Sequence, residues 1–140
     1  MEIRIIPMSL NDEEFTGMNI KDVQEKFFMK TLIDVSKGWY YYGKKGLDAE
    51  SGDLLLFQME NSIIASAILD MIMPFSKPTI EGNTGALVLD RKTIKIFKPI
   101  SKLELKEFIP EFNAFNQTKP KFKVNEVNME ELIKRMNIND

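Results

Sequence analysis

The chain has 140 residues, of which 44% are hydrophobic and 29% are charged, and its formal net charge is −2. This composition supports a hydrophobic core and excludes a wholly disordered chain, and the length predicts a single domain over residues 1–140. The absence of cysteine excludes disulfides, thiolate metal sites and cysteine nucleophiles. The absence of histidine excludes the usual general base, the usual zinc ligand and Ser–His triads.

Charge is distributed unevenly along the chain. Residues 1–90 contain 8 Lys/Arg and 14 Asp/Glu, residues 91–123 contain 9 and 3, and residues 124–140 contain 2 and 4. A basic stretch inside an acidic chain is compatible with a polyanionic partner such as nucleic acid. An ordinary solvated lysine face is the equal alternative.

The sequence contains no segment that we expect to enter a membrane. The first six residues are too short and too charged for a signal peptide, and the most apolar run, residues 62–73, contains Asp70. A membrane-spanning helix needs about 20 apolar residues. We therefore expect a cytoplasmic protein.

The first half predicts a strand over residues 3–8 and a helix over residues 19–35. Asn19 is suited to cap the helix, Asp22 lies in its first turn, and Gly38 follows its end. The apolar face expected at helical spacing consists of Val23, Phe27, Phe28, Thr31, Leu32 and Val35.

The second half predicts strands joined by short turns, followed by helices. The expected strands are 53–59, 62–69, 86–89 and 93–98, and Asn61 is expected to take a positive φ in the first turn. Ser101 and Asn128 each stand three residues before a glutamate and begin two further helices. About five strands and three helices without βαβ alternation predict an α+β fold. Its mixed, mainly antiparallel sheet is curled or closed into a pseudo-barrel.

Four consecutive aromatic residues, 39–42, precede two lysines. In a strand the first and third rings point to one side and the second and fourth to the other, so all four cannot enter one core. Exposed rings stack on nucleobases at about 1–3 kcal/mol per base, and nearby lysines attract phosphates. The alternative is that one pair lies in the core and the other covers a loop. The candidate binding residues of this segment are Trp39, Tyr40, Tyr42, Lys44 and Lys45.

A second candidate segment spans residues 112–121. Asn116 and Gln117 carry amides that donate and accept together, as the reading of a base edge requires. Lys119 and Lys121 are placed to neutralise phosphates. The alternative is a surface turn that follows a helix.

A metal-dependent nuclease is the catalytic alternative, with Asp90, Glu104 and Lys106 as its residues. That chemistry needs carboxylates at the ends of adjoining strands, converging on one metal. The capping pattern instead places Glu104 in a helix, with its carboxylate directed to the amide of Ser101. We therefore expect no metal, no cofactor and no enzymatic activity. If residues 103–107 formed a strand instead of a helix, the nuclease interpretation would be favoured.

Several segments together carry a family resemblance. An aromatic and basic loop leads into Gly52 and Asp53, then into an apolar strand whose hairpin partner, residues 63–67, ends in small residues. This pattern resembles the PUA-like superfamily, and especially its EVE-type members. The run 89–100 is similar to a strand entry of that family, and residues 115–117 are similar to a loop in PUA-like domains attached to restriction nucleases.

The resemblance covers roughly residues 39–120 and implies a mixed-sheet pseudo-barrel that binds nucleic acid. Related domains recognise modified or flipped bases in an aromatic-lined pocket. By resemblance, Gly52 and Asp53 form a structural turn. Pocket-lining and base-reading roles are implied for Trp39, Tyr40, Tyr42, Asn116 and Gln117.

The sequence therefore predicts a non-catalytic module that binds DNA or RNA and reads a modified or flipped base, with a partner nuclease acting in trans. A small protein-interaction or regulatory protein is the alternative from another class. Nine methionines permit such docking, and an exposed apolar patch away from the basic segment would favour it.

Overall fold

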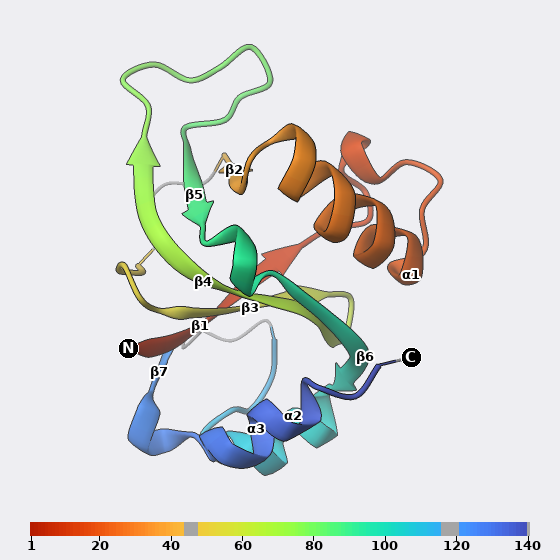
Figure 1. The fold of residues 1–140 in the computed structure, drawn as a ribbon, viewed down its shortest axis with the longest axis vertical. Helices are drawn as coiled ribbons and strands as arrows, with labels where there is room; N and C mark the ends of the chain where they lie inside the picture. Colours follow the sequence, from red (N-terminus) through yellow and green to blue (C-terminus); the bar gives the residue numbers. More distant parts are fainter. Residues whose placement is uncertain (44–47, 116–120, 140) are drawn as a thin grey trace.

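The computed structural model describes residues 1–43, 48–115 and 121–139. These ranges contain a seven-stranded mixed sheet in the order β2-β5-β4-β3-β1-β7, with β6 paired to β4 (Figure 1). The strands are β1 (Glu2–Met8), β2 (Trp39–Tyr42), β3 (Leu54–Met59), β4 (Ser62–Pro74), β5 (Gly85–Leu89), β6 (Lys95–Ser101) and β7 (Lys121–Lys123). β1 pairs with β3 in parallel and the other pairs are antiparallel, so the predicted α+β class with a mainly antiparallel sheet is confirmed.

Helices lie on both sides of this sheet. The longest begins as α1 (Ile20–Asp22) and continues as the π-helix η2 (Val23–Val35), while α2 (Lys102–Phe108) and α3 (Met129–Arg135) lie on the opposite side (Figure 1). Three single turns of 3-10 helix complete the described structure: η1 (Glu13–Phe15), η3 (Arg91–Thr93) and η4 (Val124–Glu126). In the described ranges, no helix is both long enough and apolar enough to cross a lipid bilayer.

Both faces of β3 are buried, as its continuous apolar run predicts. Leu55 and Phe57 belong to the core cluster that includes η2, whereas Leu54 and Leu56 belong to the cluster that includes α2 and α3. The sheet therefore separates two hydrophobic cores. The neighbouring strand β4 joins the two halves because it pairs with β3 on one side and with both β6 and β5 on the other.

The long helix begins as predicted but winds as a π-helix from Val23 to Val35. The side chain of Asn19 accepts a hydrogen bond from the Asp22 amide at 2.8 Å, which confirms the cap. Hydrogen bonds in a π-helix join residues five apart, as from the Ser36 amide to the Thr31 carbonyl at 2.9 Å. Ordinary helical spacing therefore fails here, and Val35, expected on the buried face, is 75% exposed.

The turn between helix and β2 depends on a glycine. Lys37 has a φ of 56° and Gly38 a φ of 87°, so two consecutive residues are left-handed before Trp39. A Cβ on Gly38 would lie 2.7 Å from the carbonyl oxygen of Leu89 and 2.9 Å from Cγ of Arg91. Only glycine fits this close approach.

Gly38→Ala is expected to lower the free energy of unfolding by about 2–4 kcal/mol, because steric overlap adds to the left-handed strain. Gly17→Ala is the matched control: Gly17 has a φ of 77°, but a Cβ there would meet nothing within 4 Å. It should lose only the strain of about 1–2 kcal/mol. Urea unfolding of both variants checks this, and equal losses would contradict the steric account.

Tyr40 belongs to the core on the η2 side. Its ring lies 5.0 Å from the ring of Phe57 and 6.1 Å from that of Phe27, measured between centroids. Burial raises the pKa of the Tyr40 phenol well above its ordinary value, and the carboxylates of Glu14 and Asp12 add to this rise.

The raised pKa of Tyr40 predicts a loss of stability in alkali. A tyrosine in the unfolded chain ionises near pH 10, so the contribution of Tyr40 is complete below about pH 10 and falls as the pH rises above it. Tyr40→Phe should make the urea midpoint less dependent on pH above about pH 10. An identical alkaline loss in the wild-type protein and the variant would show that Tyr40 does not contribute.

Candidate functional site

The four aromatic residues of β2 alternate between the two faces of the sheet, as predicted. Tyr40 and Tyr42 pack against the core on the η2 side. Trp39 and Tyr41 point to the other side, where cross-strand pairs place them beside residues of β5 and β4. We call this outer surface the aromatic face, and it consists of Trp39, Tyr41, Met71, Met73, Phe75 and Val88.

The rings of the aromatic face are neighbours, and Tyr41 at the centre of the row is open to solvent. The centroid of Tyr41 lies 6.4 Å from that of Trp39 and 6.3 Å from that of Phe75. Tyr41 is 47% exposed and Met71 is 44% exposed, values that are high for such large apolar side chains. The arrangement offers flat apolar surfaces on a rigid sheet.

The structure does not bring the predicted aromatic site residues together on one side. Trp39 lies on the aromatic face, whereas Tyr40 and Tyr42 lie on the core side of the same strand. Sequence reasoning missed Tyr41 and Phe75 as the partners of Trp39. The alternation of β2 could have indicated Tyr41, but Phe75 becomes a neighbour only through the pairing of β4 with β5.

Of the predicted polar site residues, the structure describes only Lys121. Its ammonium lies 3.2 Å from Oδ1 of Asp48 and 3.6 Å from Oε2 of Glu2. The hydrogen bond to Asp48 raises the pKa of Lys121, and the charges of Asp48 and Glu2 add to this rise. Lys121 therefore already neutralises carboxylates of the protein. The others, Lys44, Lys45, Asn116, Gln117 and Lys119, lie outside the described residues.

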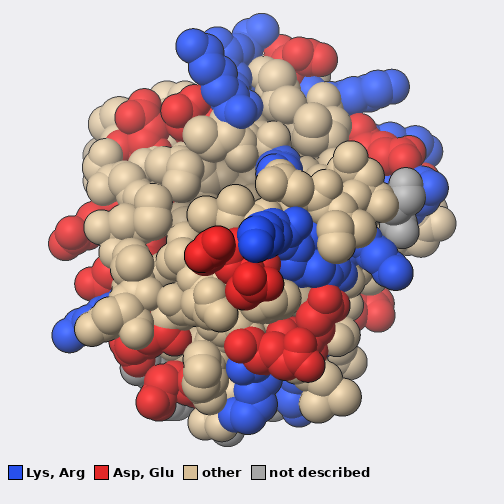
Figure 2. Space-filling view, turned by 60° about the horizontal axis from the view of Figure 1, so that its bottom comes forward, with Lys and Arg blue, Asp and Glu red and all other residues tan. Residues whose placement is uncertain are grey.

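The described residues around α2 and α3 do not form one continuous positive surface. Figure 2 shows basic and acidic side chains interspersed on this side of the molecule. Lys106 is used within the fold, because its ammonium donates to the carbonyls of Phe112 at 3.0 Å and Pro110 at 3.2 Å. Lys95 likewise donates to the side chain of Asn137.

The three residues of the nuclease alternative make hydrogen bonds or ion pairs within the fold and do not converge on one site. Asp90 accepts from the Lys92 amide at 3.1 Å, and residues 102–108 form helix α2 rather than a strand. Ser101 caps this helix as predicted, but the Glu104 carboxylate pairs with the guanidinium of Arg135 instead of the Ser101 amide. Among the described residues, no group of three or more Asp or Glu side chains is placed to hold a metal ion.

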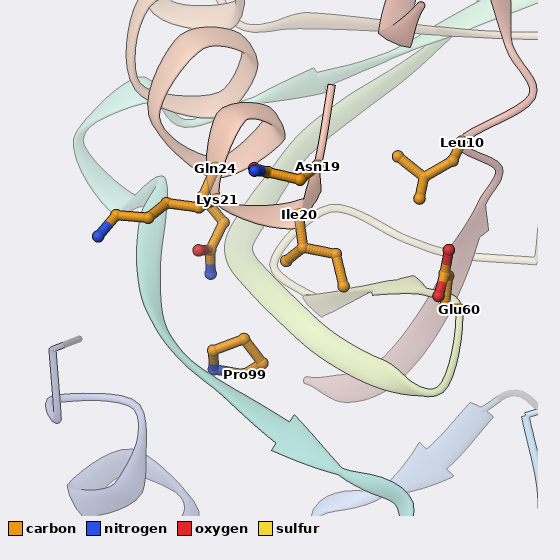
Figure 3. A pocket seen from close by; sticks show the side chains of 7 residues that line it. All are labelled: Leu10, Asn19, Ile20, Lys21, Gln24, Glu60 and Pro99. Carbon is orange, nitrogen blue, oxygen red and sulfur yellow. The ribbon is translucent and has the colours of Figure 1, made fainter. Parts of the chain in front are cut away.

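A hollow of about 460 Å³ lies between the start of the long helix and the turn that joins β3 to β4 (Figure 3). Ile20 points into the space between Pro99 and Glu60, while the ammonium of Lys21 points away from it. Gln24 forms part of the wall, and its amide donates to the carbonyls of Ile64 and Phe97. The lining residues are Leu10, Asn19, Ile20, Lys21, Gln24, Glu60 and Pro99.

A second hollow, of about 550 Å³, shares Glu60 with the first. Its wall carries an aromatic ring, two amides, an ammonium group and a carboxylate, a more polar set than the first. The lining residues are Pro7, Gln58, Glu60, Asn61, Lys102, Ala114 and Phe115. This hollow can both stack a flat ligand and hydrogen-bond to its edge.

Comparison with known proteins identifies the fold. No protein-family model matches the chain, and no curated protein is detectably similar to it in sequence. The structure is similar to the crystal structure of ASCH from Zymomonas mobilis, with a TM-score of 0.56 and 14% sequence identity over 99% of this chain and 98% of that chain. ASCH domains have a PUA-like α+β fold, and this likeness, together with the mixed sheet and its flanking helices, shows that the chain has the PUA-like fold that its sequence predicts.

Proposed function

We propose that this PUA-like domain is a non-catalytic module that binds single-stranded nucleic acid on its aromatic face. The observation that carries the proposal is the row of neighbouring rings formed by Trp39, Tyr41 and Phe75, in which Tyr41 is exposed and the other two are half-buried. Each ring that stacks on a base contributes about 1–3 kcal/mol to binding. Bases in a duplex are already stacked on one another, so this surface suits unpaired bases.

Cationic side chains flank the aromatic face where a backbone would pass. Lys37 and Arg91 are exposed, and the Arg91 side chain packs against Gly38, immediately before Trp39. Lys77 is exposed in the loop that follows Phe75. These charges attract phosphates without reading sequence, which fits stacking that is tolerant of base identity.

The finer function that we propose is EVE-type reading of a modified or flipped base, with delivery of the bound strand to a nuclease acting in trans. The fold and the polar hollows beside Glu60 support the reading role. A flipped base needs a ring to stack against and hydrogen-bonding groups for its edge. Phe115 and the amides of the second hollow supply these groups.

Trp39 is the single tryptophan of the chain, so its fluorescence reports directly on the aromatic face. Titration with oligo(dT) or oligo(U) is expected to quench this emission. Tyr41→Ala should weaken binding by about 5- to 150-fold, the equivalent of about 1–3 kcal/mol for one stacked base. The control Tyr40→Phe, on the core side of the same strand, should bind normally. Unchanged Trp39 emission, or full affinity in Tyr41→Ala, would overturn the proposal.

The affinity is also expected to fall as salt rises, because phosphate contacts release counterions. For a single strand, each neutralised phosphate contributes about −0.7 to the slope of log K against log salt. Lys37→Gln, Lys77→Gln and Arg91→Gln should each make the slope shallower, measured by the same quenching. An affinity that does not change with salt would remove these three residues from the proposal.

A protein-docking role is the second candidate function. The aromatic face is apolar, exposed and outside the basic segment 91–123, as that alternative requires. If the partner that docks on the aromatic face is a second copy of the chain, sedimentation should show concentration-dependent association. Met71→Lys should abolish this association. Oligonucleotides would then leave Trp39 emission unchanged.

A further inference from the structure

Glu60 occupies a backbone conformation that its residue type rarely adopts. In the two-residue turn between β3 and β4, Glu60 has a φ of 55°, whereas Asn61, the residue expected to take it, does not. Asparagine tolerates this conformation better than glutamate does. The amide of Gln58 donates to the Glu60 carbonyl and so helps to hold the turn. Residues with strained backbone conformations are common at functional sites, so the side chain of Glu60 is a candidate ligand-binding group.

The wall of the second hollow contains Glu60 together with groups of complementary chemistry. The Phe115 ring is held by Phe112, with centroids 4.9 Å apart. Gln58 is 8% exposed, and its amide donates to the Glu60 carbonyl. Asn61 offers a second amide, and Lys102 is the cation of the wall. The wall of the hollow therefore combines an aromatic ring, two amides, a carboxylate and a cation.

These groups favour one nucleobase. An ionised carboxylate has two acceptor oxygens and no donor, so it matches two donors that lie next to each other. Guanine presents such a pair, N1–H and N2–H₂, on its Watson–Crick edge, whereas adenine places an acceptor at N1. An amide donor from Asn61 or a water molecule matches the O6 acceptor of guanine. The Phe115 ring supplies the stacking surface, and Lys102 supplies a charge for phosphate.

We propose that this hollow is a binding site for the guanine base of a nucleotide, with the Glu60 carboxylate as the group that selects it. The inference rests on the proposed function only for its ligand class, because it uses no residue of the aromatic face. The two sites lie at opposite ends of β4: Glu60 and Asn61 precede its first residue, Ser62, and Phe75 follows its last, Pro74.

The direct test is titration of the full chain with GMP, AMP and UMP, followed by calorimetry or amide chemical shifts. GMP is expected to bind at least about tenfold more tightly than AMP or UMP, since a matched bidentate pair discriminates by about 1–3 kcal/mol. Guanosine should bind more weakly than GMP, and Lys102→Gln should remove that difference. Equal binding of the three nucleotides would overturn the role of Glu60, and absence of any GMP binding would overturn the site.

Variants at Glu60 separate binding from folding. Glu60→Gln replaces one acceptor by a donor and should abolish the preference for GMP. Glu60→Gly should also lose the preference for GMP. Its unfolding midpoint should equal or exceed that of the wild-type protein, because glycine adopts the positive φ without strain. Glu81→Gln, at an exposed carboxylate of the β4–β5 loop, is the matched control and should bind GMP normally. Full GMP preference in Glu60→Gln would overturn the proposal.

Trp39 emission distinguishes failure of this inference from failure of the proposed function. Oligo(dT) contains no guanine, so it tests the aromatic face, while GMP binding that Glu60→Gln weakens tests the hollow. Quenching by oligo(dT) without GMP binding would leave the proposed function standing and remove the guanine site. GMP binding with no response to oligo(dT) would leave the guanine site standing and remove the proposed function of the aromatic face.

Discussion

The buried amide of Gln24 supports the bend on which the arrangement of the sheet depends. The register between β4 and β6 shifts between Ile63 and Ala65, so the ladder is interrupted at Ile64. Gln24 donates to the Ile64 carbonyl at 2.8 Å and to the Phe97 carbonyl at 2.7 Å. A buried carbonyl without a partner costs about 1–3 kcal/mol, so one side chain of the helix makes this bulge stable. Gln24 therefore links the position of the helix to the curvature of the strand.

The bend has a functional consequence because it allows β4 to pair with two strands on the same side. Its first half pairs with β6, and after a second register shift near Leu69 its last residues pair with β5. Figure 1 shows this part of β4 and β5 extending away from α2 and α3. η2 covers the inner side of the extension, and the outer side carries the aromatic face. The same curvature separates that face from the hollows beside Glu60.

Features set by local chemistry could be predicted from the sequence, whereas features set by pairing could not. The cap at Asn19, the two buried faces of β3 and the alternation of β2 follow from residue type and spacing, and the structure confirms them. The exposure of Val35 follows from π-helical winding, which ordinary helical spacing does not predict. Phe75 joins Trp39 and Tyr41 only through the register of β4 on β5. The positive φ of Glu60 opposes the residue preference that favoured Asn61.

Segment charge is a weaker guide to the binding surface than the placement of rings. Lys106 donates to carbonyls of the segment that follows α2, and Lys121 pairs with Asp48 and Glu2, so part of the positive charge of the basic segment 91–123 already has partners within the protein. A carboxylate paired with such a lysine competes with any phosphate for it. Stacking on Tyr41 requires no such exchange, because the ring is already exposed to solvent. If the domain binds nucleic acid, most of its binding energy must then come from the aromatic face, and its dependence on salt must be shallow for a protein with 19 basic residues.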